Sequence, residues 1–381
     1  MNTGRTRKKP VTPAWLRPWL AAIVLVAFPV ARAQSAADAP AMGFMQLSQP
    51  DGAATSVFYP ASGAEVAVRQ GPFSLSWVPD GAPLKGNGRL VVISHGSGGA
   101  PWVHVDLARA LVRRGFTVAI PLHQGDNYLD RSEPGPVSWR KRPREVSEAI
   151  DRVGRQAALA SQLSLDSVGV FGGSAGGHTA LSLAGGQWSD ERFKAHCDRN
   201  IEQDFSSCVG FLTLLKGNAL DPLKIWTARR VIDWRFSDAT VHRYRDPRVT
   251  AAVAMVPFAA DFIPESLARP AVHLGLVIAR KDVNQVPRFH VEAILKACTP
   301  HCEVVMDLPE GSHGAMLSPM PPLERNSVDE HLLVDPPSFN REQAIPELNA
   351  RIADFFVRHL AAAQKLRLDG NPAGGSSSTA R

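Results

Sequence analysis

A serine flanked by glycines lies at residues 172–176, Gly-Gly-Ser-Ala-Gly, between an apolar run and a helix-like segment. The pattern fits G-x-S-x-G, in which a sharp strand-to-helix turn strains the serine backbone and the glycines let strand and helix approach closely. A glycine-rich turn that tolerates any small residue would look the same over these five positions. Because a strand-like run precedes Ser174 and a helix-like run follows it, we interpret Ser174 as a nucleophile.

A serine hydroxyl needs a base that takes its proton and a third group that orients this base. His313 lies in a Glu-Gly-Ser-His-Gly loop directly after the apolar run 304–308, and we predict that it is the base. Asp282 closes an earlier strand-like run and is the predicted acid. Asp261, which follows the preceding strand-like run, is the alternative acid, and either aspartate could instead cap a helix.

Acyl transfer also develops negative charge on an oxygen, which donors fixed in advance can stabilise. We predict that one donor is the backbone N–H of Ala175, at the start of the helix, and the other that of Ser97, in the loop 94–99. A phosphate-binding loop is the alternative interpretation of this loop, but it lacks both the G-x-G-x-x-G spacing and a Walker lysine. We interpret His95, in the same loop, as a structural hydrogen-bonding residue.

The elements that must position these residues alternate from residue 89 onward. Strand-like apolar runs lie at 90–94, 117–121, 167–171, 251–256, 272–278 and 303–308, and helix-like segments at 103–114, 144–163, 175–184, 288–297 and 341–362. Apolar runs between amphipathic helices are typical of a mostly parallel sheet covered on both faces. We therefore predict an α/β fold, opened by antiparallel strands at 42–47, 56–59 and 73–78.

Residues 187–247 interrupt this alternation with polar and aromatic sequence, and we interpret them as a cap inserted into one α/β domain spanning 42–362. Trp102 and aromatic residues of the cap could line an acyl or alcohol pocket, although simple packing explains them equally well. Segment 34–41 is predicted to be flexible, and 363–381 has the composition of a disordered tail.

Residues 1–33 combine a basic start, the apolar run 19–30 and Ala-Arg-Ala at 31–33, which is the pattern of a cleaved signal peptide. A membrane anchor is the alternative, but the run is short for a span. We therefore expect an exported protein, periplasmic or secreted, without stable membrane insertion after cleavage.

The basic charge of the chain lies in this leader. Residues 1–33 hold six of the 42 Lys and Arg and none of the 36 Asp and Glu, so the rest of the chain is balanced at 36 of each. A balanced surface argues against nucleic acid or an anionic membrane as partners of the exported chain.

Four cysteines, Cys197, Cys208, Cys298 and Cys302, follow the predicted leader. In an oxidising compartment they are expected to form two disulfides. Three pairings are possible, and we favour Cys197 with Cys208 and Cys298 with Cys302, because short loops close most easily. A four-cysteine zinc site would need closely spaced pairs such as C-x-x-C, which the sequence lacks.

Together these features resemble the α/β-hydrolase superfamily. Within it the chain is similar to the exported "predicted dienelactone hydrolase" group, which is related to platelet-activating-factor acetylhydrolases and more remotely to bacterial polyester hydrolases. The resemblance covers roughly 42–362, and its carriers are the segment 51–60, the loop 94–98, the turn at Ser174, Ala-Arg-Lys-Asp at 279–282 and Gly-Ser-His at 311–313.

This resemblance implies cleavage of a small-molecule or lipid-like carboxylic ester through an acyl-enzyme, without a metal or organic cofactor. True dienelactone hydrolases have cysteine where this chain has Ser174, which favours a general carboxylesterase over a lactonase. A serine peptidase or amidase would share every residue named here. A non-catalytic exported binding protein on the same scaffold is the third possibility.

Overall fold

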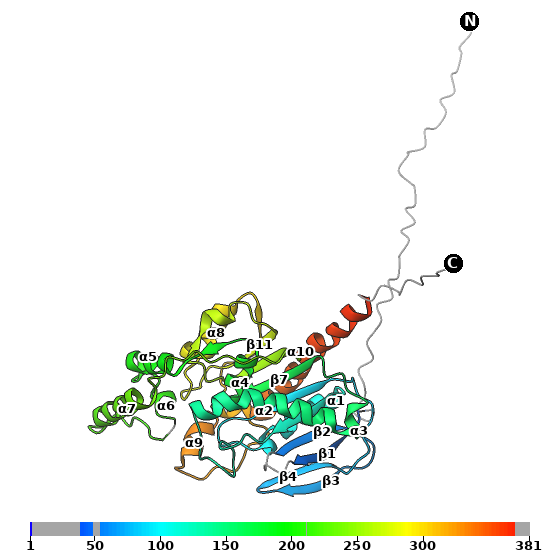
Figure 1. The fold of residues 1–381 in the computed structure, drawn as a ribbon, viewed down its shortest axis with the longest axis horizontal. Helices are drawn as coiled ribbons and strands as arrows, with labels where there is room; N and C mark the ends of the chain where they lie inside the picture. Colours follow the sequence, from blue (N-terminus) through cyan, green and yellow to red (C-terminus); the bar gives the residue numbers. More distant parts are fainter. Residues whose placement is uncertain (2–38, 49–53, 211, 370–381) are drawn as a thin grey trace, which may run out of the picture. The chain divides into compact units, whose positions relative to one another are not determined.

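In a computed structural model, the described residues are 1, 39–48, 54–210 and 212–369 (Figure 1). Apart from Met1, the predicted leader lies outside them, as do most of the segments 34–41 and 363–381, so these assignments stay predictions. Residues from Pro40 onward form one compact unit.

Ten strands of the described chain form one sheet in the order β12-β11-β9-β7-β5-β6-β2-β1-β4-β3. Their bounds are β1 Ala41–Ser48, β2 Ala54–Ala61, β3 Val66–Gln70, β4 Phe73–Pro79, β5 Leu90–Ser94, β6 Thr117–Pro121, β7 Val168–Gly173, β9 Val249–Met255, β11 His273–Ala279 and β12 Cys302–Leu308. Strands β5 to β7, β9, β11 and β12 pair in parallel, whereas β1 with β2, β2 with β6 and β3 with β4 are antiparallel. The predicted α/β class with a mostly parallel sheet is confirmed, but the opening is not antiparallel throughout, because β1 pairs with β4 in parallel.

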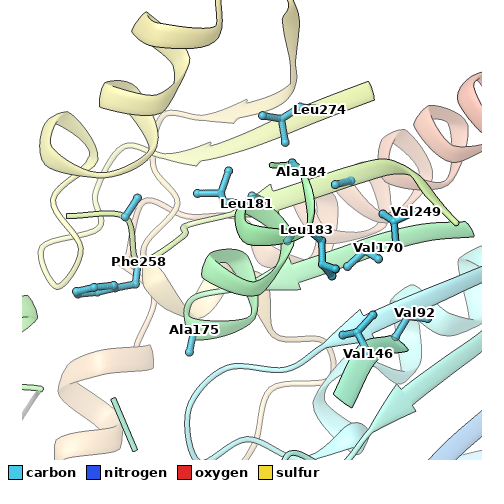
Figure 2. Close-up of a cluster of buried hydrophobic side chains, with 14 of the residues drawn as sticks. Val92, Val146, Val170, Ala175, Leu181, Leu183, Ala184, Val249, Phe258 and Leu274 are labelled. Carbon is cyan, nitrogen blue, oxygen red and sulfur yellow. The ribbon is translucent and has the colours of Figure 1, made fainter. Parts of the chain in front are cut away.

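Helices cover both faces of this sheet. The main ones are α1 Val105–Arg113, α2 Pro136–Arg155, α4 Ala175–Leu183, α8 Val291–Cys298 and α10 Arg341–Asp369. Side chains of α2, α4 and α8 belong to one buried cluster and those of α1 and α10 to another. Figure 2 shows part of the first cluster, where Leu183 of α4 lies near Val170 and Val146 of α2 lies near Val92 of the central strands. The central strands are buried throughout, which explains their unbroken apolar sequence.

The helix expected at 144–163 begins earlier, at Pro136, and ends at Arg155. Proline is well suited to a first helical turn, because its missing N–H would lack an intrahelical partner there. Pro143 lies inside the helix, where the residue type would normally predict an interruption. A further short helix, α3 Ala157–Ala160, follows.

Residues 187–247 form the helices α5 Asp190–Asn200, α6 Phe205–Cys208 and α7 Asp221–Arg235, together with β8 Gln187–Trp188. β8 pairs with β10 Phe262–Ile263 in a separate two-stranded sheet. In Figure 1, α5, α6 and α7 lie together beyond the carboxyl end of the central strands. We call this segment the cap.

The disulfides are Cys197–Cys208, which joins α5 to α6, and Cys298–Cys302, which joins α8 to β12. Both predicted pairings are confirmed. Shorter elements complete the described chain: η1 Pro101–His104, η2 Pro264–Leu267, η3 Pro287–Phe289, η4 His313–Met316 and α9 Val328–Leu333. Over the described ranges, every helix is too short or too polar to cross a bilayer.

Candidate active site

Ser174 lies between the end of β7 and the start of α4, with φ of 53°. This left-handed conformation is costly for a residue other than glycine and is found mainly where the surroundings impose it. A Cβ atom at Gly172 would come 1.9 Å from the Gly176 carbonyl oxygen, and one at Gly176 would come 1.9 Å from the Ser94 carbonyl oxygen. Both glycines are therefore required by the approach of the backbones at this turn.

His313 connects Ser174 to Asp282. Its Nε2 lies 3.1 Å from Ser174 Oγ, and its Nδ1 lies 2.7 Å from Asp282 Oδ2. The other oxygen of Asp282 accepts hydrogen bonds of 2.9 Å from the amides of Asn284 and Gln285, which fix the carboxylate. All three side chains are buried. The predicted nucleophile, base and acid are thus joined in one hydrogen-bonded chain.

The alternative acid, Asp261, has a different partner. Its Oδ2 lies 2.9 Å from Nε2 of His178, on the helix that follows Ser174, and both side chains are fully buried. The ring of His178 also stacks on Trp139. The geometry therefore brings Asp282, and not Asp261, to His313.

A buried ion pair between Asp126 and Arg142 contacts the loop 94–99. Asp126 accepts hydrogen bonds from the hydroxyl of Ser97 at 2.5 Å and the amide of Gly98 at 3.0 Å. Arg142 binds the other oxygen of Asp126 at 2.8 Å and also donates to the carbonyl oxygen of His95. Burial alone would raise the pKa of Asp126, but Arg142 and the hydroxyl donors hold it below its ordinary value.

The two amides predicted to bind the oxyanion are available for a ligand. Among the described residues, the N–H groups of Ser97 and Ala175 have no hydrogen-bond acceptor. Both residues line the same cavity as Ser174. The amide of Gly98, the next residue along the loop, already donates to Asp126 and is therefore not available to a ligand.

Gln285 is a site residue that we did not predict from the sequence. Its Nε2 donates to Ser174 Oγ at 3.2 Å. The Ser174 hydroxyl donates its proton to His313, so any other partner of Oγ must donate to it. The side-chain N–H of Gln285 does so in this orientation of the amide. Its position three residues after Asp282 was the only available signal.

A second serine and histidine pair lies in the sheet but has a structural role. Ser94 Oγ is 2.8 Å from His123 Nε2, and His123 Nδ1 is 2.5 Å from Glu145. Ser94 is fully buried at the end of β5, so a substrate cannot reach it. Burial lowers the pKa of His123 well below its ordinary value and raises that of Glu145, which favours the neutral forms.

A mainly apolar cavity of about 570 Å³ lies between Ser174 and the cap. Its walls include Trp139, Phe193 and Phe258, and side chains of α7 line it from the cap. Trp102 is not among the lining residues and instead stacks on Trp77, which corrects the suggestion that it forms the pocket. The cavity can hold an apolar group directly beside the Ser174 hydroxyl.

No family model matches this chain, and no curated protein matches it either. The sheet order, its parallel centre and the β1–β2 hairpin are consistent with an α/β-hydrolase-like fold. The fold and the geometry around Ser174 are therefore the observations that bear on the function.

Proposed function

We propose that this protein is a serine hydrolase that cleaves carboxylic esters through an acyl-enzyme. The observation that carries the proposal is the chain of hydrogen bonds from Ser174 through His313 to Asp282, at a strained turn that faces a cavity. This arrangement supplies a nucleophile, a base and an orienting carboxylate in the geometry that acyl transfer requires.

In the first half of the reaction, Ser174 Oγ attacks the ester carbonyl carbon while His313 Nε2 takes the hydroxyl proton. Asp282 orients the ring and stabilises the imidazolium that forms. The carbonyl oxygen, now negative, accepts hydrogen bonds from the amides of Ser97 and Ala175. The C–O bond to the alcohol then breaks, and His313 gives its proton to the departing oxygen.

In the second half, a water molecule attacks the acyl-enzyme, and His313 takes a proton from it as the new C–O bond forms. Collapse of the second tetrahedral intermediate breaks the bond to Ser174 Oγ, which recovers its proton from His313. The products are a carboxylic acid and the free serine.

The apolar cavity favours an ester with an apolar group over a charged peptide. A serine rather than a cysteine at position 174 favours a general carboxylesterase within the group of exported predicted dienelactone hydrolases that the sequence resembles. The two disulfides support export, because such bonds persist outside the reducing cytosol.

The test is labelling with a fluorophosphonate, followed by peptide mass spectrometry. The expected result is one adduct on Ser174, with labelling and p-nitrophenyl acetate hydrolysis both lost in Ser174→Ala. Hydrolysis that persists in Ser174→Ala, or without an adduct, would overturn the mechanism. Comparison of p-nitrophenyl esters of increasing chain length with anilides and a lactone then distinguishes an esterase from an amidase or lactonase.

A further inference from the structure

The cap presents an apolar surface to solvent. Trp226 and Trp234 of α7 are 59% and 82% exposed, and Leu212, just before the helix, is 85% exposed. Tryptophan normally buries most of its surface, and a contiguous exposed apolar group marks an interaction site. Leu220, Leu223 and Val231 are also largely exposed. We call these six residues the cap patch.

Two exposed tryptophans of helix α7 are not explained by the cavity. Thr227, Ala228 and Ile232 line the cavity, whereas Trp226 and Trp234 do not. Both tryptophans are largely exposed, and the proposed reaction gives neither of them a function.

The mouth of the cavity lies within the cap patch. Leu212, Leu223 and Val231 line the cavity and are exposed to solvent at the same time, while Ser174 lines its inner end. A surface that covers the patch would thus cover the opening that leads to Ser174.

The segment that carries the patch has an excess of basic residues, although Lys224 pairs with Asp221 and Arg230 with Asp233. Residues 212–235 contain five basic residues, Lys216, Lys224, Arg229, Arg230 and Arg235, and two acidic ones, Asp221 and Asp233. This local excess contrasts with the overall balance of residues 34–381, from which we expected no anionic membrane partner. It disfavours self-association through the patch, since two copies would bring like charges together, and it is complementary to an anionic partner.

Exposed tryptophan and leucine beside arginine are typical of surfaces that lie in the headgroup region of a bilayer. We infer that the cap patch docks peripherally on an anionic phospholipid surface and receives an apolar ester from it. Docking rests on α7 and its flanks alone, whereas delivery of the ester to Ser174 also rests on the proposed function. Such docking requires no membrane span.

The test measures cosedimentation with vesicles of phosphatidylglycerol or of phosphatidylcholine. It uses the chain from Gln34 onward, because the compact unit begins at Pro40 and an attached leader would itself bind lipid. The substitution Ser174→Ala is present throughout, so that hydrolysis does not alter the vesicles. We expect binding to the anionic vesicles, weaker binding at high salt, and much weaker binding to the neutral ones.

Two double variants separate the apolar and the charged contributions. Trp226→Ser with Trp234→Ser should abolish binding, and Arg229→Gln with Arg230→Gln should weaken it about thirtyfold. Arg69→Gln with Arg155→Gln is the matched control, because both arginines are exposed and lie outside the cap. Circular dichroism and the thermal midpoint verify that each variant is folded.

Equal binding by the control and by both cap variants would overturn the inference. So would a lack of binding by the parent protein, or a dimer that the tryptophan substitutions dissociate. Failure of the proposed function gives a different result, because vesicle binding would persist while the protein with Ser174 intact gained no fluorophosphonate adduct.

Discussion

The side-chain amide of Gln285 donates a hydrogen bond of 3.2 Å to Ser174 Oγ. The acid also fixes the position of Gln285, because the backbone N–H of Gln285 donates a hydrogen bond of 2.9 Å to Asp282 Oδ1. One residue thus links the carboxylate loop to the hydroxyl at the other end of the hydrogen-bonded chain. Gln285 is a positioning residue in the proposed reaction.

Replacement of Gln285 by Met removes this donor while keeping the length of the side chain. We expect kcat for a small p-nitrophenyl ester to fall about tenfold with little change in KM, because one hydrogen bond to the reacting oxygen is lost. Val283→Ala is the matched control, since Val283 belongs to the same loop but is 72% exposed. An unchanged kcat in Gln285→Met would contradict the positioning role.

The two aspartates should respond differently to replacement by asparagine. Asp282→Asn removes the carboxylate that orients His313, and kcat should fall by roughly 10³- to 10⁴-fold. Asp261→Asn disturbs the buried pair with His178, so the free energy of unfolding should fall by about 1–3 kcal/mol with kcat largely kept. Steady-state kinetics and urea unfolding on both variants check this. The reverse pattern would make Asp261 the acid.

The ion pair between Arg142 and Asp126 supports the loop that carries the Ser97 amide. Arg142→Met leaves the Asp126 carboxylate buried without its cation, which should cost about 3–5 kcal/mol of unfolding free energy and lower kcat. Arg144→Met, at an exposed position of the same helix, is the control. Ser138→Ala removes only one hydroxyl donor to Asp126 and should cost about 1 kcal/mol. Full activity in Arg142→Met would show that the loop keeps its shape without the pair.

Acid should destabilise the protein below neutral pH through its buried histidines. Burial lowers the pKa of His104 from 6.5 to about 4, so the native protein leaves it uncharged where the unfolded chain binds a proton. The contribution of neutral, buried His104 to the free energy of unfolding is fully present above pH 6.5. It is lost as the pH falls from 6.5 to 4, and the loss amounts to about 3 kcal/mol. His95 and His123 are shifted in the same direction.

His104→Phe tests this contribution, because the ring of His104 already packs against Phe171. Urea unfolding between pH 7.5 and pH 4.5 should show a dependence on pH that is weaker by about one proton, or about 1.4 kcal/mol per pH unit. An identical slope in the variant and the parent would exclude His104 as a source of acid sensitivity.

The sequence made the sheet and the ends of its strands predictable. Strands β5 and β6 have the predicted bounds, since short apolar runs between polar segments leave little freedom of assignment. Once the sheet is parallel, the carboxyl ends of its strands meet at one edge, which brings Ser174, Asp282 and His313 together. Both disulfide pairings were also predictable, because each joins the two cysteines that are closest in sequence.

Other features depend on contacts that no local pattern encodes. Gln285 and Ser174 are 111 residues apart, and the contact depends on the path of the loop after Asp282. The partner of Arg142 could not be identified because a charged residue in a helix is usually exposed. The position of Trp102, stacked on Trp77, likewise depends on where β4 lies relative to η1, which carries Trp102.

The close approach of Gly176 to the Ser94 carbonyl means that β5 and α4 meet through their backbones, without side chains between them. The helix that carries the Ala175 amide and the start of the loop that carries the Ser97 amide are therefore in direct main-chain contact. Side chains of the cap, in contrast, form the far wall of the cavity. Variation at those cap positions can change which molecules fit, while the atoms that would bind the transition state remain the same.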